Sequence, residues 1–219
     1  MKRIYIDPGH SSKDPGAVGY AVERDLNEIT AKHMYDHLLA NYVCEAAVDP
    51  VDNNSLTAIT DKANAWKADL LVSIHFNAGG GDGYEALVYS EKRKDLGEVF
   101  EKHVKAIGQN SRGVKYRPNL AVLKNSNMPA VLNEGAFVDN KKDIQDWDED
   151  HELKKLGIAY AEATAEWLAL EKKAVEPIPE KEYIYRVQVG AYTKKANADA
   201  MLKQLIDAGF GGIVVRSEK

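Results

Sequence analysis

Hydrophobic and polar positions alternate in short blocks over the first 170 residues. Short runs rich in Val, Ile and Leu predict strands at residues 3–7, 44–48, 70–75, 85–89 and 130–134. Longer segments predict helices at residues 26–39, 56–66, 92–107 and 152–170, the last with apolar residues at clear helical spacing. Strands that alternate with helices indicate an α/β fold, in which helices flank both faces of a mixed, mostly parallel sheet.

The pattern changes after residue 170. Residues 171–182 are charged, contain Pro177 and Pro179 and have no hydrophobic period, which predicts a linker between a domain over residues 1–170 and a module over residues 183–219. In that module, residues 183–190 and 212–217 predict strands, and residues 194–208 predict a helix. A strand–helix–strand module of this size has little core of its own, so we expect it to pair with a second copy or to dock on another surface.

The charge and the hydrophobic runs of the chain argue against two classes of protein, nucleic-acid binders and membrane-spanning proteins. The formal net charge is -5, and neither part of the chain has the basic face expected of a nucleic-acid binder. No apolar stretch approaches the length of a membrane-spanning helix, so we expect no membrane insertion. The apolar run that follows Met1, Lys2 and Arg3 is too short for a signal peptide. We expect synthesis in the cytoplasm, and a substrate outside the membrane would then be reached only after release by another agent.

Three predicted strand ends carry chemically active side chains. His10 follows the first strand, His75 ends the third, and Glu134 ends the strand that begins at residue 130. Because ligands gather beyond the carboxyl ends of strands in α/β sheets, these side chains could meet at one edge. Two histidines and a carboxylate suit a catalytic zinc site, and a further carboxylate would take a proton from water. Taken singly, each residue also has a structural explanation, as a turn residue, a core histidine or a loop cap.

Four segments, in order along the chain, carry a more specific signal. They are IYIDPGHSSKDPGAVG, ERDLN, ADLLVSIHFNA and PAVLNEGAFVDN. Over residues 1–170 the chain thereby resembles the zinc-dependent N-acetylmuramoyl-L-alanine amidases of the autolysin and phage-endolysin type. The resemblance implies one Zn²⁺ per chain, the catalytic residue Glu134, a substrate contact at Asn77 and the metal ligands His10, Glu23 and His75. Without the resemblance, Asp25 and Glu28 compete with Glu23 as the carboxylate ligand.

Two departures from the family pattern concern contacts with substrate. Residues 11–13 replace the family's glycine-rich continuation, and neither residues 50–52 nor residues 60–61 supply the arginines that the family commonly has. An alternative metal site on a helix lacks one required residue. His33 and His37 lie four positions apart, but Met34 stands where a metalloprotease helix requires glutamate.

The resemblance implies a peptidoglycan hydrolase. Such an enzyme cleaves the amide bond between N-acetylmuramic acid and L-alanine with zinc-activated water, and Glu134 would act as the base. Two alternatives stay open. The first is a zinc peptidase that cuts within the peptide stems of the same polymer, and the second is a non-catalytic peptidoglycan-binding protein with a degenerate site.

The tail, YRVQVGAYTKKANADAMLKQLIDAGFGGIVV, resembles the sporulation-related (SPOR) peptidoglycan-binding repeat. The match covers about half of the usual double unit. It implies peptidoglycan as the partner, with Gln188 and Tyr192 as candidate glycan contacts. Because the match covers only half a unit, we expect either a homodimer that completes the sheet through the repeat or a chain cut short at Lys219. A small dimerisation appendage is the alternative to wall binding.

Overall fold

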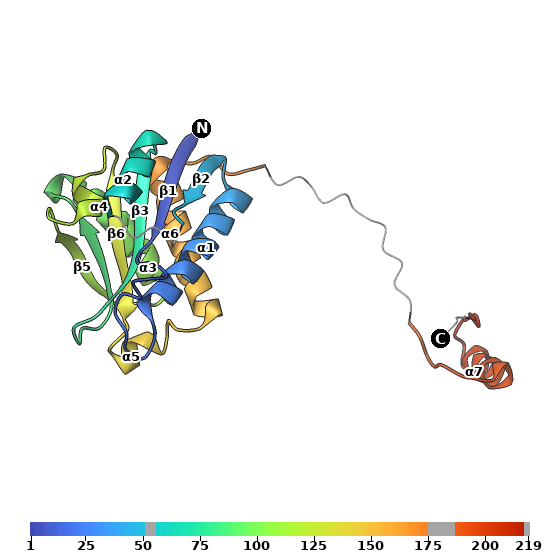
Figure 1. Ribbon diagram of the computed structural model, residues 1–219. Coiled ribbons are helices and arrows are strands. Elements are labelled where there is room, and N and C mark those ends of the chain that lie inside the picture. Colours follow the sequence, from blue (N-terminus) through green and yellow to red (C-terminus); the bar gives the residue numbers. More distant parts are fainter. Residues whose placement is uncertain (51–55, 175–186, 217–219) are drawn as a thin grey trace. The chain divides into compact units, whose positions relative to one another are not determined.

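The computed structural model describes residues 1–50, 56–174 and 187–216. The chain divides into two compact units, Met1–Ala174 and Val175–Lys219 (Figure 1). None of the described helices combines the length and the apolar character that crossing a bilayer requires.

A six-stranded sheet with the order β2-β1-β3-β6-β4-β5 forms the centre of the larger unit. The pairings β1–β2, β1–β3, β3–β6 and β4–β5 are parallel, and only β4–β6 is antiparallel. This confirms the predicted mixed, mostly parallel sheet. The strands are β1 (Lys2–Pro8), β2 (Cys44–Val48), β3 (Leu70–Asn77), β4 (Tyr84–Val88), β5 (Ser111–Tyr116) and β6 (Ala130–Phe137).

Helices cover both faces of this sheet, as predicted (Figure 1). One face carries α1 (Glu23–Asn41), α3 (Lys94–Ala106) and α6 (Asp150–Leu168). The other face carries the shorter α2 (Leu56–Ala65) and α4 (Ala121–Lys124). Two further short elements, η1 (Glu91–Arg93) and α5 (Lys141–Ile144), lie in the connections before α3 and after β6.

The two faces are covered to different extents. On the α1, α3 and α6 face, alternate strand residues such as Ile4, Ile74 and Val131 are all 0% exposed. On the opposite face, α2 and α4 pack against a smaller apolar cluster that includes Leu71 and Leu132. Beyond that cluster, the next positions on the same face are polar and lie at the carboxyl ends of β3 and β6. This change from apolar to polar marks the place where chemistry is expected.

In the larger unit, the predicted elements differ from the structure mainly at their ends and at one strand. All five strands predicted in residues 1–170 are present, but β5 was not predicted, because SRGVKY has few apolar residues and Gly113 has a φ of 83°. Helix α1 begins at Glu23, three residues before its predicted start at residue 26. The earlier start matters because it places Glu23 in the first turn of a helix.

The predicted linker begins inside the larger unit. The Val43 amide donates to the Glu171 carbonyl at 2.8 Å, and the Lys173 amide donates to the Asn41 carbonyl at the same distance. Residues 171–173 therefore pair with residues 41–43 at the end of α1, and residues 175–182 of the predicted linker lie outside the described residues.

The described part of the second unit contains the predicted helix, α7 (Lys195–Asp207). Residues 187–190 and 212–216 do not pair as the predicted strands, and residues 183–186 lie outside the described part. The physical reason is a lack of partners, since a pair of short strands is marginal in water without a third strand or a packed face. Accordingly, Val187 and Ile213 are 91% and 83% exposed.

Candidate metal and catalytic site

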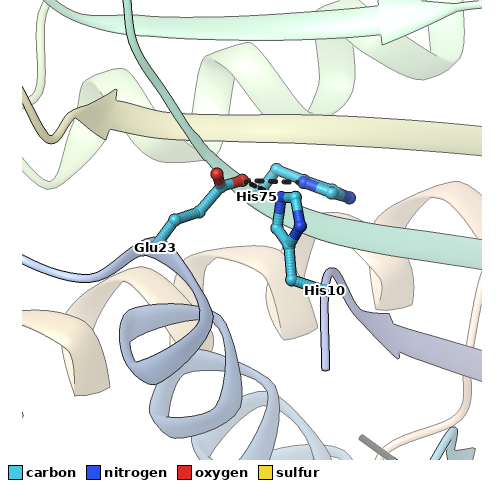
Figure 2. A group of neighbouring side chains, drawn as sticks. All are labelled: His10, Glu23 and His75. Carbon is cyan, nitrogen blue, oxygen red and sulfur yellow. Dashed lines mark hydrogen bonds and ion pairs between the residues drawn. The ribbon is translucent and has the colours of Figure 1, made fainter. Parts of the chain in front are cut away.

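Three side chains from separate segments meet at the carboxyl ends of β1 and β3 (Figure 2). His10 follows β1, Glu23 opens α1, and His75 lies near the end of β3. Glu23 Oε1 lies 3.0 Å from His10 Nε2 and 2.8 Å from His75 Nδ1. One ligand atom from each residue lies within 4.8 Å of the other two. The structure therefore brings together the three residues predicted as metal ligands.

Two glycines allow the chain to approach these side chains closely. A Cβ atom on Gly9 would lie 2.1 Å from Cε1 of His75. A Cβ atom on Gly16 would lie 2.5 Å from Glu23 Oε2, and its φ of 69° also favours glycine. His10 itself has a φ of 71°, a left-handed conformation that is uncommon outside glycine and is often found at functional sites. The loop backbone is thus shaped to place the ligands.

Further polar groups hold the three ligands in position. Asp14 Oδ2 lies 3.1 Å from His10 Nδ1, and the Ala17 amide donates to Glu23 Oε2 at 2.8 Å. The buried Asn27 amide group donates to the Gly9 carbonyl at 3.0 Å, which ties α1 to the loop before His10. The sequence prediction gave Asp14 and Asn27 no role. A histidine with a carboxylate four residues later, and the asparagine of ERDLN, were the available signals.

The electrostatics of the cluster favour positive charge. Burial opposes ionisation of Glu23, but hydrogen bonds from the His10 and His75 rings outweigh it and lower the Glu23 pKa to about 2. The hydrogen bond to Glu23 also raises the pKa of His10 to about 9, against the effect of burial. Two imidazole nitrogens and a carboxylate oxygen are also the donor types that zinc prefers. The residues present therefore fit a zinc ion.

Glu134 lies beside this cluster on the next strand. It is the register partner of His75 between β3 and β6, so the two side chains share one face of the sheet. Its Oε2 atom is buried and has no hydrogen-bond partner. Burial raises the Glu134 pKa to about 7, while the nearby His75 lowers it and Glu23 raises it further. A carboxyl group with these properties is suited to accept and return a proton near neutral pH.

Comparisons with known proteins agree with this geometry. A family model described as N-acetylmuramoyl-L-alanine amidase matches residues 4–166. The chain belongs to the N-acetylmuramoyl-L-alanine amidase family. The predicted family is thereby confirmed, and with it the class of activity, peptidoglycan amide hydrolysis. A second model, described as SPOR domain, matches residues 155–219 and confirms the resemblance of the tail, although its match begins within α6.

Individual relatives and structures are similar to this amidase over most of its length. The N-acetylmuramoyl-L-alanine amidase CwlM of Bacillus licheniformis is 33% identical over 225 residues, which cover 98% of this chain and 85% of that protein. The endolysin of Bacillus phage SPP1 is 36% identical over 196 residues, or 83% and 71% of the two chains. The catalytic domain of the amidase CwlV from Bacillus (Paenibacillus) polymyxa var. colistinus aligns with a TM-score of 0.73 at 29% identity, covering 78% of this chain and all of that one.

The other predicted site residues of the amidase lie in different surroundings. Asn77 ends β3, and its side-chain oxygen accepts from the Ala78 amide at 2.8 Å. In the second unit, Gln188 donates to the Gly190 carbonyl at 3.3 Å, and Tyr192 is 42% exposed. Asn77 lies two residues after His75 on β3, whereas Gln188 and Tyr192 belong to the second compact unit.

The histidine pair set aside in the sequence has structural partners. His33 Nε2 lies 2.9 Å from Asp150 and His37 Nε2 lies 2.7 Å from Glu162, so both histidines join α1 to α6.

Proposed function

We propose that this amidase is a zinc hydrolase that cleaves the bond between N-acetylmuramic acid and L-alanine, with His10, Glu23 and His75 as ligands and Glu134 as the base. One observation carries the proposal: a compact His–Glu–His cluster lies beside a carboxyl group whose Oε2 is buried and unpartnered. A binding protein without catalysis would have no use for that carboxyl group, because burial of an unpartnered polar atom is costly.

Each residue has a defined part in the reaction. Zinc, when bound, would acidify a water molecule and polarise the substrate carbonyl. Glu134 takes a proton from the attacking water as its oxygen bonds to the lactyl carbonyl carbon of the muramic acid. The C–N bond then breaks, and Glu134 returns the proton to the departing nitrogen of L-alanine. The products are a muramic acid carboxyl group and a peptide stem with a free amino terminus. Asp14 fixes the orientation of the His10 ring through Nδ1.

The tail would bind the wall that the catalytic domain cuts. The SPOR match supports this role, and Gln188 and Tyr192 present exposed polar and aromatic groups of the kind that contact glycans. Tethering the enzyme raises its effective concentration near each new bond, without any change at the active site. We place the action of the protein in the cell wall, as the names of the matched endolysin and cell wall amidases imply for those proteins. A catalytic domain over residues 1–170 and a binding module from residue 183 remain the proposed division.

Hydrolysis of purified peptidoglycan, with products identified by mass, tests the proposal directly. The full chain should release intact stems that begin with free L-alanine, and a zinc chelator should abolish the release until zinc is restored. New amino termini within the stems would instead support the peptidase alternative. Wall binding with no cleavage, in protein that retains zinc, would support the non-catalytic alternative.

A further inference from the structure

A row of polar side chains extends from the metal ligands across four neighbouring strands. His75 on β3 pairs in register with Glu134 on β6, and Glu134 pairs with Glu85 on β4. Register partners present their side chains on the same face of a sheet. The row ends at Arg112 on the edge strand β5, whose Nε donates to Glu85 Oε1 at 2.6 Å. The row lies on the same face of the sheet as α2 and α4. These two helices cover only the apolar cluster that includes Leu71 and Leu132, and the row lies beyond that cluster.

Arg112 is held at one end of its guanidinium and open at the other. Glu85 is 7% exposed and engages only Nε, and the guanidinium carbon lies 5.3 Å from the centre of the Phe137 ring. The Arg112 side chain is nevertheless 44% exposed, and no described residue accepts a hydrogen bond from its two Nη atoms. An arginine has five N–H donors in a fixed fork, which matches a carboxylate. An anchored arginine with two free Nη groups is therefore prepared to bind an anion.

The distance from the reacting bond selects which anion. Neighbouring strands lie about 4.8 Å apart, so β5 is about 10 Å from β6. The hydrogen bond to Glu85, on the strand between them, draws the Arg112 guanidinium towards Glu134, so that the two groups lie closer together than the two strands. Two residues of extended peptide span about 7 Å. A substrate whose scissile carbonyl lies beside Glu134 would therefore present the second residue of its peptide stem to Arg112.

We infer that Arg112 is a specificity-determining residue that binds a free α-carboxylate on the second residue of the peptide stem. The inference rests on the proposed function, because it assumes that the scissile bond lies at Glu134. It also assigns a direction to the substrate. The stem, which carries carboxylates, lies over β6, β4 and β5, and the largely neutral glycan lies towards β1. The half-buried Lys115, which follows on the same face of β5, adds positive charge to the same side.

Two synthetic disaccharide tripeptides test this assignment. In both, the second stem residue is joined to the third through its side-chain carboxyl group, and the compounds differ only in that its α-carboxyl group is free in one and amidated in the other. The wild-type full chain should cleave the free acid with a kcat/KM about tenfold higher, mainly through KM, as expected for one charge-assisted hydrogen-bonded pair. Arg112→Gln should reduce this ratio to about one, and Arg112→Lys should retain part of it. Arg93→Gln removes an exposed arginine without an ion pair in the described chain, and it should leave the ratio unchanged.

The ratio separates recognition from a structural or electrostatic role. Loss of the pair with Glu85 could alter Glu134, but it would slow both substrates equally and leave the ratio intact. A ratio near one in the wild type, or the same ratio in Arg112→Gln, would overturn the inference. Calorimetric binding of both compounds to Glu134→Gln gives a second readout without cleavage. Preference for the free acid that disappears in Glu134→Gln/Arg112→Gln supports the assignment even if the proposed chemistry is wrong, and equal binding of both compounds overturns it.

Discussion

The two faces of the sheet serve different purposes in this amidase. On the face covered by α1, α3 and α6, strand side chains such as Ile74 and Val131 are 0% exposed and form a continuous apolar core. On the other face, α2 and α4 pack against the cluster that includes Leu71 and Leu132, and the row from His75 to Arg112 lies beyond it. Neighbouring side chains on the same strand, such as Ile74 and His75, therefore contribute either to the core or to the chemistry.

The comparison shows how the site is supported. Alternate residues of β3 and β6 pack against long helices, so the strands that present His75 and Glu134 are fixed from behind. A rigid strand holds a reacting group more accurately than a loop does. The face that carries the site is free to place polar groups that do not stabilise the fold, such as the unpartnered Oε2 of Glu134. We therefore expect substitutions in the polar row to change activity without stability, and those in the apolar core behind it to change stability without chemistry.

The largest expected effect is that of Glu134→Gln. Removal of the proposed base should lower kcat by about 10²- to 10⁴-fold, the usual contribution of general acid–base catalysis. The free energy of unfolding should stay the same or rise, because the substitution replaces a buried, unpartnered carboxyl oxygen. Steady-state kinetics, zinc content and urea denaturation measure the three quantities. Glu149→Gln, at an exposed position, is the control, and a Glu134→Gln protein with full activity would refute the role of the residue.

The opposite behaviour is expected of Leu156→Ala, on the face of the sheet covered by α1, α3 and α6. Leu156 lies in α6, is 0% exposed, and lies 2.9 Å from the position that a Cβ atom on Gly135 would occupy. Truncation of a buried leucine costs about 2–5 kcal/mol of unfolding free energy through lost contacts and a residual cavity. At a temperature where the variant is folded, kcat should match that of the wild type. Lys155→Ala, on an exposed position of the same helix, should change neither quantity, and equal losses in both variants would contradict the comparison.

Much of this division was predictable from the sequence. Continuous apolar runs identify buried strands, and the side chains at their carboxyl ends identified His10, His75 and Glu134 as residues of one edge. Glu23 could not be identified in this way, because it lies in the first turn of a helix beside other carboxylates. Only the resemblance to a family selected it over Asp25 and Glu28, and the structure then shows its carboxylate between the two histidine rings.

Other features depend on contacts between segments that are distant in sequence. β5 was missed because an edge strand needs few apolar residues, and Arg112 was missed with it. Its role depends on Glu85, 27 residues away in the chain. In the tail, the alternating pattern of residues 187–190 was sufficient to predict a strand, but a strand forms only where another strand accepts its hydrogen bonds. Sequence patterns thus report which side chains can be buried, and not whether a partner is present.

The smallest expected effect on stability comes from a polar contact between α1 and α6, on the face of the sheet that these helices cover. Glu162 accepts a hydrogen bond from the Tyr42 hydroxyl at 2.7 Å and lies 2.7 Å from His37 Nε2. Burial opposes its ionisation, but these two partners outweigh burial and hold the Glu162 pKa below its usual value. A carboxyl group with a lowered folded-state pKa stabilises the protein above its unfolded-state pKa, and this stabilisation is lost as the pH falls through the folded-state pKa.

Glu162→Gln should therefore lower the free energy of unfolding by about 1 kcal/mol at pH 7, the net value of a typical hydrogen bond at a partly exposed site. The difference between variant and wild type should shrink as the pH falls below about 4.5, where the wild-type carboxyl group begins to lose its advantage. Urea denaturation at several pH values measures it. Glu98→Gln breaks an exposed pair with Lys94 and should have a smaller effect at every pH. A loss from Glu162→Gln that stays constant down to pH 3 would show that the residue acts through packing and not through its charge.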